Sequence, residues 1–164
     1  MTAAVAAAGL AAVALQAPVG ASGAQVTRGD FVTTAAGHDA GYDIGGRAQM
    51  VRTADGKTIV TVNLTGLLPA DHAYAVHVHN APCSTGGGGH YQFPAGTPAI
   101  DGASPVVTAD GVRYEIWPGP VDPNPAGNGS GQVTVAATAG AEASSVVVHV
   151  TSTGGNRLAC ADLG

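Results

Sequence analysis

The strongest constraint on the fold is the way in which short runs of Val, Ile and Thr alternate with turns rich in Gly, Pro, Asn and Asp. No long segment keeps the 3.6-residue period of an amphipathic helix, whereas several runs keep the period of two that is typical of strands. Apolar Val60 and Val62, for example, flank polar Thr61, which predicts one buried and one polar face. The chain is therefore predicted to be all-β.

The strand-like runs are short and follow one another along most of the chain. They cover residues 48–53, 58–64, 72–79, 112–117, 132–137, 145–150 and 158–160. Asp55-Gly56, between the first two runs, is a strong signal for a tight hairpin. About eight antiparallel strands fit an immunoglobulin-like β-sandwich or a Greek-key barrel. Residues 81–105 and 118–131 are expected to form long irregular loops, which are commonly functional or disordered.

Residues 1–24 carry no charged side chain and include an Ala-rich apolar run. The run has the length of a signal-peptide core, and Ser22-Gly23-Ala24 ends it with small residues that suit a signal peptidase. The usual positive segment before the run is missing, and an Ala-rich soluble helix is the alternative. A membrane span needs about 20 apolar residues, more than this run offers. We therefore expect a cleaved signal peptide at 1–24 and one domain at 25–164, secreted or held in the periplasm or cell envelope.

Charged residues make up only 10% of the chain, and eleven acidic against six basic residues give a net charge of −5. The basic residues form no cluster. Nucleic-acid binding rests on cationic side chains that neutralise phosphates, so a nucleic acid is not an expected partner. The chain has two cysteines, Cys83 and Cys160, which allow one disulfide or none. Export would permit the disulfide.

The chain has six histidines, as many as its lysines and arginines together. His77 and His79 alternate with valines on one predicted strand, so both rings share a face, rooted roughly 7 Å apart. His90 follows four glycines, and His149 lies near the end of a Val-rich run. An imidazole within an apolar strand is costly unless its nitrogens are satisfied, and Cu, Zn, Fe or Ni satisfies them. For any single histidine, a hydrogen-bonded or surface side chain is the alternative. The remaining two lie beside aspartates and are expected to be exposed: His38 and His72.

Six short motifs follow one another along nearly the whole predicted domain. They are Leu64-Thr-Gly-Leu, Tyr74-Ala-Val-His-Val-His, Cys83, Gly89-His90, Val146-Val-Val-His149 and Arg157-Leu-Ala-Cys160. Their order closely resembles that of the copper/zinc superoxide dismutase family. The C-terminal Gly-Asn-Arg-Leu-Ala-Cys is the most specific of them, because it matches independently of the histidines.

The resemblance implies a Greek-key β-barrel with one copper ion, and it assigns roles to individual residues. The implied copper ligands are His77, His79, His90 and His149. A disulfide between Cys83 and Cys160 is implied as well. Arg157 would lie beside the copper and orient an anion, and His90 would leave the metal on reduction and carry a proton. The implied reaction is dismutation of superoxide to oxygen and hydrogen peroxide.

Two departures from the zinc-bearing members of that family indicate a copper-only site. No histidine lies between His90 and His149, where those members carry further zinc ligands. Only seven residues, 150–156, occupy the place of the long electrostatic loop. Both features resemble the copper-only branch, whose site is more open to solvent. Zinc is therefore not an expected cofactor.

Without zinc, the second nitrogen of His90 needs another partner to fix its ring. Glu115 is our candidate, and Asp122 is the second choice. A solvent-facing strand position is the alternative interpretation of Glu115.

The expected function is copper-dependent dismutation of superoxide, a small anionic substrate. A non-catalytic copper-binding or copper-delivery module is the first alternative, and a structural domain that has lost its metal is the second. Arg157 favours the enzyme, because a pure carrier has no need of a cation that guides an anion. Members of the family often form homodimers, and a homodimer is compatible with this chain.

Overall fold

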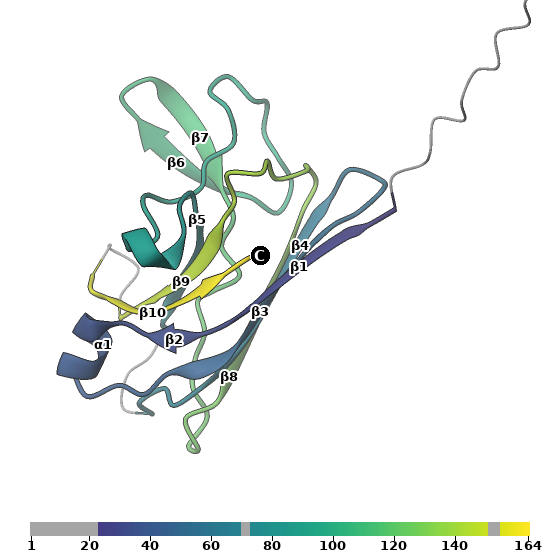
Figure 1. Ribbon diagram of the computed structural model, residues 1–164. Coiled ribbons are helices and arrows are strands. Elements are labelled where there is room, and N and C mark those ends of the chain that lie inside the picture. Colours follow the sequence, from purple (N-terminus) through teal and green to yellow (C-terminus); the bar gives the residue numbers. More distant parts are fainter. Residues whose placement is uncertain (1–22, 70–72, 151–154) are drawn as a thin grey trace, which may run out of the picture.

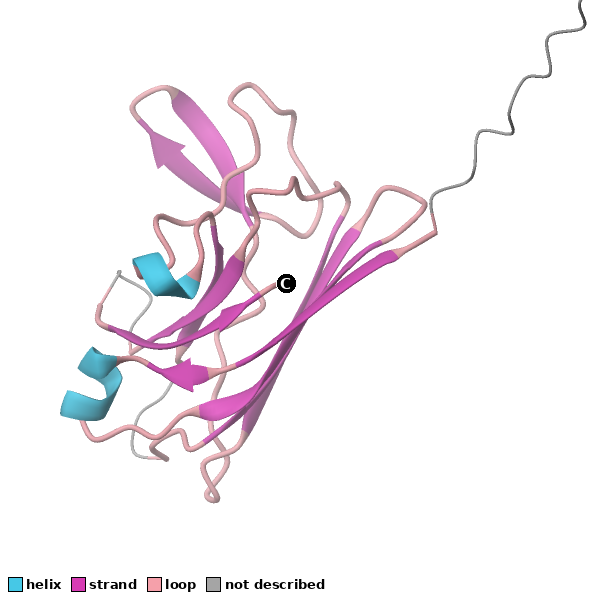
Figure 2. Ribbon diagram, in the orientation of Figure 1, coloured by secondary structure: helices cyan, strands magenta, loops and turns pink. Residues whose placement is uncertain are grey.

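The computed structural model describes residues 23–69, 73–150 and 155–164, and all statements on structure concern these residues. They contain two four-stranded antiparallel sheets and a separate two-stranded hairpin (Figures 1 and 2). The first sheet has the order β1 (Gln25–Asp30), β3 (Gly45–Arg52), β4 (Thr58–Thr65), β8 (Gly129–Val135). The second has the order β2 (Val32–Thr33), β10 (Arg157–Asp162), β9 (Ser145–His149), β5 (Ala75–His79). The hairpin consists of β6 (Ser104–Thr108) and β7 (Gly111–Glu115), and the short helices are α1 (Ala35–Asp39) and the 3-10 helix η1 (Cys83–Thr85).

One hydrophobic core holds the two sheets together. Met50 and Val60 of the first sheet belong to the same buried cluster as Val76 and Val146 of the second. Each fully buried aliphatic side chain contributes about 1.5–3 kcal/mol relative to an exposed one. The predicted all-β antiparallel fold is confirmed, in the form of two sheets that share a core.

The N-terminal segment belongs to both sheets. β1 pairs with β3, and β2 pairs with β10, with only Phe31 between β1 and β2. The side chain of Phe31 is buried in the core. The chain thus crosses from one sheet to the other at this residue, which ties the two layers together at their edge.

The hairpin predicted at Asp55-Gly56 is confirmed. β3 and β4 pair antiparallel up to Arg52 and Thr58, so the turn lies between these residues. Gly56 has a φ of +83°, a conformation that glycine adopts without the steric penalty of a Cβ atom.

All seven predicted strand segments overlap strands, but five elements were not predicted: β1, β2, β6, α1 and η1. β6 begins at Ser104, within a region expected to be irregular, and β8 likewise begins earlier than predicted, at Gly129. The residues of β6 are half-buried or exposed and none is buried. A strand that buries no side chain shows no apolar alternation, which is the pattern that prediction from sequence uses.

Strands β5 and β9 differ from the other strands because every residue in both is buried. They pair with each other, and the second edge of β5 is taken by loops: Val78 donates to Ile116 O at 3.0 Å and accepts from Tyr91 N at 2.8 Å. Segments 90–91 and 116 therefore lie directly beside β5.

Almost all of the predicted signal peptide, and His72, lie outside the described residues. The first strand begins at Gln25. His38 is exposed, as expected. Among the described helices, none has the length and apolar character needed to cross a membrane.

Candidate metal centre

Four histidines meet on the outer side of the second sheet. His77 and His79 come from β5, His149 ends β9, and His90 follows η1 and pairs with His79 through an isolated bridge. One ring nitrogen of each can be chosen such that all four lie within 4.8 Å of one another. The ring centroid of His77 lies 4.1 Å from that of His90 and 5.1 Å from that of His149. The period of two predicted from the sequence thus brings both β5 rings to one point, and the loop adds the fourth.

Three of the four side chains are inaccessible to solvent. His77 and His79 are fully buried, and His149 is 2% exposed. Neither ring nitrogen of His77 has a hydrogen-bond partner within the described structure. A buried polar nitrogen without a partner is unfavourable by about 1–3 kcal/mol, and coordination of a metal ion removes that penalty for one nitrogen. The cluster therefore has the property expected of a metal site.

The hydrogen bond of His149 leaves one of its nitrogens free for a metal ion. Nδ1 of His149 lies 3.0 Å from the carbonyl oxygen of Gly155. A carbonyl only accepts, so Nδ1 carries the proton, and in the neutral ring Nε2 has the lone pair. This Nε2 lies 3.3 Å from Nε2 of His79, inside the cluster.

His90 is oriented in the same way, by a carboxylate. Its Nδ1 lies 2.8 Å from Oε2 of Glu115, which is only 3% exposed. Burial alone would raise the pKa of Glu115, but hydrogen bonds from His90, Gln92 and Trp117 lower this pKa to about 2. The ionised carboxylate accepts, so Nδ1 of His90 donates and its Nε2 is left for the cluster.

The structure brings Glu115, our sequence candidate, into contact with His90, whereas Asp122 lies elsewhere. Oδ1 of Asp122 accepts a hydrogen bond from Ala73 N at 2.8 Å, and the residue is exposed. The interpretation of Glu115 as a solvent-facing residue is wrong, because this side chain is buried among hydrogen-bond donors.

The environment keeps the buried histidines neutral. Burial lowers the pKa of His77 and of His79 to about 3, with further lowering by the charges of His90 and His149. Burial also lowers the pKa of His149. A neutral imidazole is the form that binds metal ions, so the cluster is ready to coordinate at neutral pH without first losing protons from these rings.

A glycine-rich loop covers the cluster, and Arg157 is anchored to that loop. The guanidinium donates to the carbonyls of Gly86 and Gly88, and Arg157 pairs with His149 across β10 and β9. Gly87 has a φ of +81°, and a Cβ there would lie 3.0 Å from a methyl group of Val147. Glycine is required at this position because the loop lies directly on β9.

The predicted disulfide is present. Cys83 and Cys160 are bonded, which joins η1 at the start of the glycine loop to β10. Oδ1 of Asp162 accepts a hydrogen bond from Cys83 N at 2.7 Å, at the same junction. The loop that carries His90 is thus fixed to the sheet at its first residues.

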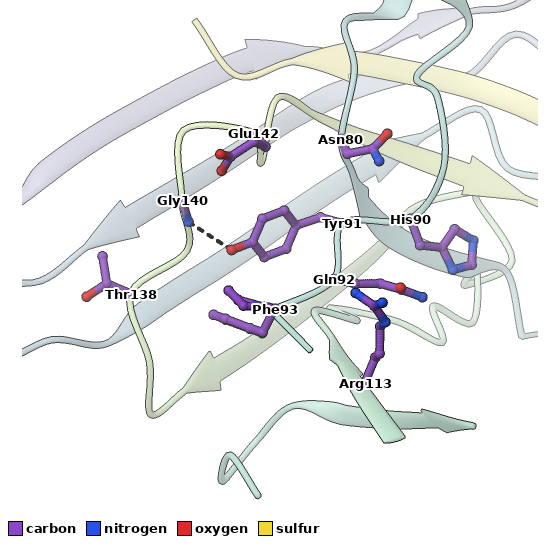
Figure 3. A pocket seen from close by; sticks show the side chains of 10 residues that line it. Asn80, His90, Tyr91, Gln92, Phe93, Arg113, Thr138, Gly140 and Glu142 are labelled. Atoms are coloured by element: carbon purple, nitrogen blue, oxygen red, sulfur yellow. Dashed lines mark hydrogen bonds between the residues drawn. The ribbon is translucent and has the colours of Figure 1, made fainter. Parts of the chain in front are cut away.

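A cleft of about 460 Å³ opens beside His90 (Figure 3). His90, Gln92 and Arg113 lie at one end of it, and Thr138, Gly140 and Glu142 lie toward the other. The side chain of His90 is 26% exposed, in contrast to the three buried histidines. Solvent therefore reaches the cluster on the side of His90.

Two residues that contact Glu115 were missed from the sequence: Gln92 and Trp117. Nε2 of Gln92 donates to Oε1, and Nε1 of Trp117 donates to Oε2, each at 2.8 Å. Gln92 follows His90 by two residues, and Trp117 follows Glu115 by two. The period of two in extended chain, applied to these loop residues, was the signal that could have found them.

No model of a known protein family matches this chain. A comparison with curated proteins likewise found no match.

The donor set itself fits a borderline metal ion. Four neutral imidazoles suit copper, zinc, nickel or iron, and copper(II) binds most tightly among the divalent ions of the first transition row. The residues that would hold the ion are His77, His79, His90 and His149.

Proposed function

We propose that this protein is a copper-dependent superoxide dismutase that resembles the copper-only branch of the copper/zinc family. The observation that carries the proposal is the contact between Nδ1 of His90 and the ionised Glu115. In zinc-bearing members of that family the corresponding nitrogen binds zinc. Here a carboxylate takes that place, which supports a centre with one copper ion and no zinc.

When bound, copper supplies one-electron chemistry, by which two superoxide ions and two protons become one oxygen molecule and one hydrogen peroxide. The three buried histidines would hold the ion at a position that their burial shields from solvent. His90 lies at the exposed side, where substrate arrives. Its Nδ1 proton stays directed at Glu115, so its Nε2 is the atom placed to take up a proton and deliver it to the product.

Arg157 supplies the positive charge that attracts the anion. Its guanidinium is held by two backbone carbonyls of the glycine loop, so its position is fixed before substrate arrives. The net charge of −5 opposes an anionic substrate, but exposed charges are screened beyond about 8–10 Å in physiological salt. The local field of Arg157 and the metal then dominates at the site.

The proposal includes the closed Greek-key barrel of that family and an exported location. Two antiparallel sheets with one core are compatible with the barrel. The Cys83–Cys160 disulfide supports export, because disulfides persist in oxidising compartments and are rare in the cytosol. A homodimer, as many members of the family form, is part of the same proposal.

The experiment that tests the function uses the protein purified without its first 24 residues. Metal is removed, and samples are reloaded with copper alone, zinc alone or both, then assayed for dismutation of superoxide. We expect activity with copper alone, none with zinc alone, and no gain from adding zinc to copper. Stoichiometric copper without activity would contradict the enzyme and leave the copper carrier.

A matched variant separates guidance of the anion from metal binding. Arg157→Lys keeps the positive charge but loses the fork that two carbonyls hold, and Arg157→Ala loses both. We expect unchanged copper content in both variants and a graded loss of dismutation, larger for alanine. Equal activity of all three proteins would remove Arg157 from the proposed mechanism.

A further inference from the structure

Trp117 touches two separate parts of the metal centre. It is the single tryptophan of the chain and follows β7 by two residues. Its ring lies against the ring of His77, with centroids 4.3 Å apart and planes at 39°. Its Nε1 donates a hydrogen bond of 2.8 Å to Oε2 of Glu115. Trp117 therefore contacts the proposed ligand His77 directly, and it also contacts Glu115, the hydrogen-bond partner of the proposed ligand His90.

The contact with His77 is important because no hydrogen bond from the described residues orients that ring. His149 is held by Gly155, and His90 is held by Glu115, but both nitrogens of His77 are without a hydrogen-bond partner in the described part of the chain. Rotation of an imidazole about χ2 has broad minima, so packing alone must fix its angle. The indole ring of Trp117 is one of the groups that pack against the His77 ring.

The contact with Glu115 fixes the carboxylate that orients His90. Oε2 of Glu115 accepts from both His90 and Trp117, and Oε1 accepts from Gln92. The indole N–H thus determines, together with Gln92, the position from which the carboxylate reaches His90. Removing it would leave Oε2 with a single donor.

We propose that Trp117 is a positioning residue of the metal centre, which orients His77 by packing and His90 through Glu115. This inference rests on the metal centre of the proposed function but not on its dismutase activity. Partners of metal-ligating histidines affect metal affinity by about 10–100-fold. The same position makes the emission of Trp117 a reporter of the metal, because copper(II) quenches a fluorophore in contact with its ligand and closed-shell zinc(II) does not.

The first test is a fluorescence titration of the metal-free wild-type protein with copper(II) and, separately, zinc(II). We expect copper(II) to quench the tryptophan emission, with an endpoint at one equivalent, and zinc(II) to leave the intensity nearly unchanged. The bound copper is counted independently by elemental analysis. One bound copper per chain with unquenched emission would overturn the inference.

The second test compares three variants by copper(II) affinity and by the electron paramagnetic resonance spectrum of the copper. Trp117→Phe keeps a ring beside His77 but loses the donor to Glu115, and Trp117→Leu loses both. Gln92→Leu is the matched control, since it removes one donor to Glu115 without contacting His77. We expect similar, modest spectral shifts in Trp117→Phe and Gln92→Leu, and a larger shift with about tenfold weaker binding in Trp117→Leu.

The outcomes separate this inference from the proposed function. Wild-type spectra and affinity in both Trp117 variants, with copper bound, would contradict the positioning role alone. Failure of the wild-type protein to bind copper would contradict the metal centre and the inference with it. If Trp117→Leu does not fold, Trp117→Phe decides: a shift that matches Gln92→Leu supports the inference, and an unshifted spectrum overturns it.

Discussion

Two strand pairs, β4 with β8 and β5 with β9, each lie at one end of a sheet and have the same antiparallel pairing, but their surroundings differ. Residues of β4 alternate between buried and more exposed, and residues of β8 alternate between half-buried and exposed up to the buried Val135, because the outer face of their sheet meets solvent. Every residue of β5 and β9 is buried. The difference shows that β5 and β9 of the second sheet are covered on both faces, by the core on one side and by loops on the other.

The histidines lie on the covered outer face. Val76 and Val78 belong to the core, and alternation turns His77 and His79 to the opposite side. There the glycine loop brings His90 over the sheet, and the end of β7 with the residues that follow brings Glu115 and Trp117. Asn63 and Thr65 on the outer face of β4 are exposed, whereas the outward-facing positions of β5 are enclosed and available for a metal site.

Removal of a histidine from β9 gives the largest expected effect. We expect His149→Ala to weaken copper binding by more than the roughly 100-fold that loss of a ligand's hydrogen-bond partner causes. Asn63→Ala, on the exposed face of β4, is the matched control and should bind as the wild type does. Competition with a chelator of known affinity measures both. Equal copper affinities of His149→Ala and Asn63→Ala would show that the covered face of the second sheet does not bind the metal.

Loss of the disulfide is the next largest effect, because it releases the loop that covers β9. The bond closes a sequence separation of 77 residues, for which chain entropy predicts a contribution of about 4 kcal/mol to the free energy of unfolding. We expect the double variant Cys83→Ser, Cys160→Ser to unfold at a much lower urea concentration and to bind copper more weakly. An unchanged midpoint would mean that the loop is held without the crosslink.

Substitution of Glu115 tests the partner of His90 at nearly constant shape. We expect Glu115→Gln to lower copper affinity about 10–100-fold, because the amide accepts more weakly than the carboxylate. Asp122→Asn makes the same chemical change at the residue that contacts Ala73 instead. It should have no effect on copper. Identical copper affinity, rate and pH profile in Glu115→Gln and the wild type would refute the role of Glu115.

Acid should destabilise the metal-free protein through the covered face. Burial lowers the pKa of His77 and His79 from 6.5 to about 3 in the fold. Between these values the unfolded chain binds more protons, so the free energy of unfolding decreases as the pH falls. Glu115, with a pKa lowered from 4.5 to about 2, adds its own loss only below pH 4.5. We expect the urea concentration at the midpoint of unfolding to decrease as the pH is lowered from 6.5 to 4.5.

The double variant His77→Ala, His79→Ala is the control for this pH dependence. It should reduce the decrease of the urea midpoint over that interval, whatever its absolute stability, and His149, whose pKa burial also lowers, should account for part of the decrease that remains. A midpoint of the wild type that stays constant, or rises toward acid, would show that these rings are not held neutral by burial.

Longer strands that bury side chains were predictable from the sequence, whereas the two strands that bury none were not. The alternation of Val60, Thr61 and Val62 reflects a core on one side, so β4 was predicted nearly to its ends. β1 and β6 have no buried residue and are specified by pairing with a neighbour. Pairing involves backbone atoms, which leave little trace in the side-chain pattern.

The residues of the candidate site also divide into those that the sequence predicted and those that it did not. His77 and His79 follow from the period of two, and the positions of His90, His149 and Arg157 came from the resemblance. The hydrogen bonds around Glu115 join a segment near residue 90 to one near residue 115. Local spacing shows which residues of one segment share a side, but it does not show that the two segments meet. Trp117 is the last residue of a predicted strand run, and that pattern gives no sign of its contact with His77, which depends on how the loop crosses β5.

The central claim is that the enclosed histidines hold one copper ion and no zinc. The most direct measurement is elemental analysis of the metal-free protein after equilibration with equal, buffered concentrations of copper(II) and zinc(II). The account predicts one copper per chain and negligible zinc in the wild type, and loss of that copper in His149→Ala. Tightly bound zinc in the wild type, or full copper content in His149→Ala, would contradict it.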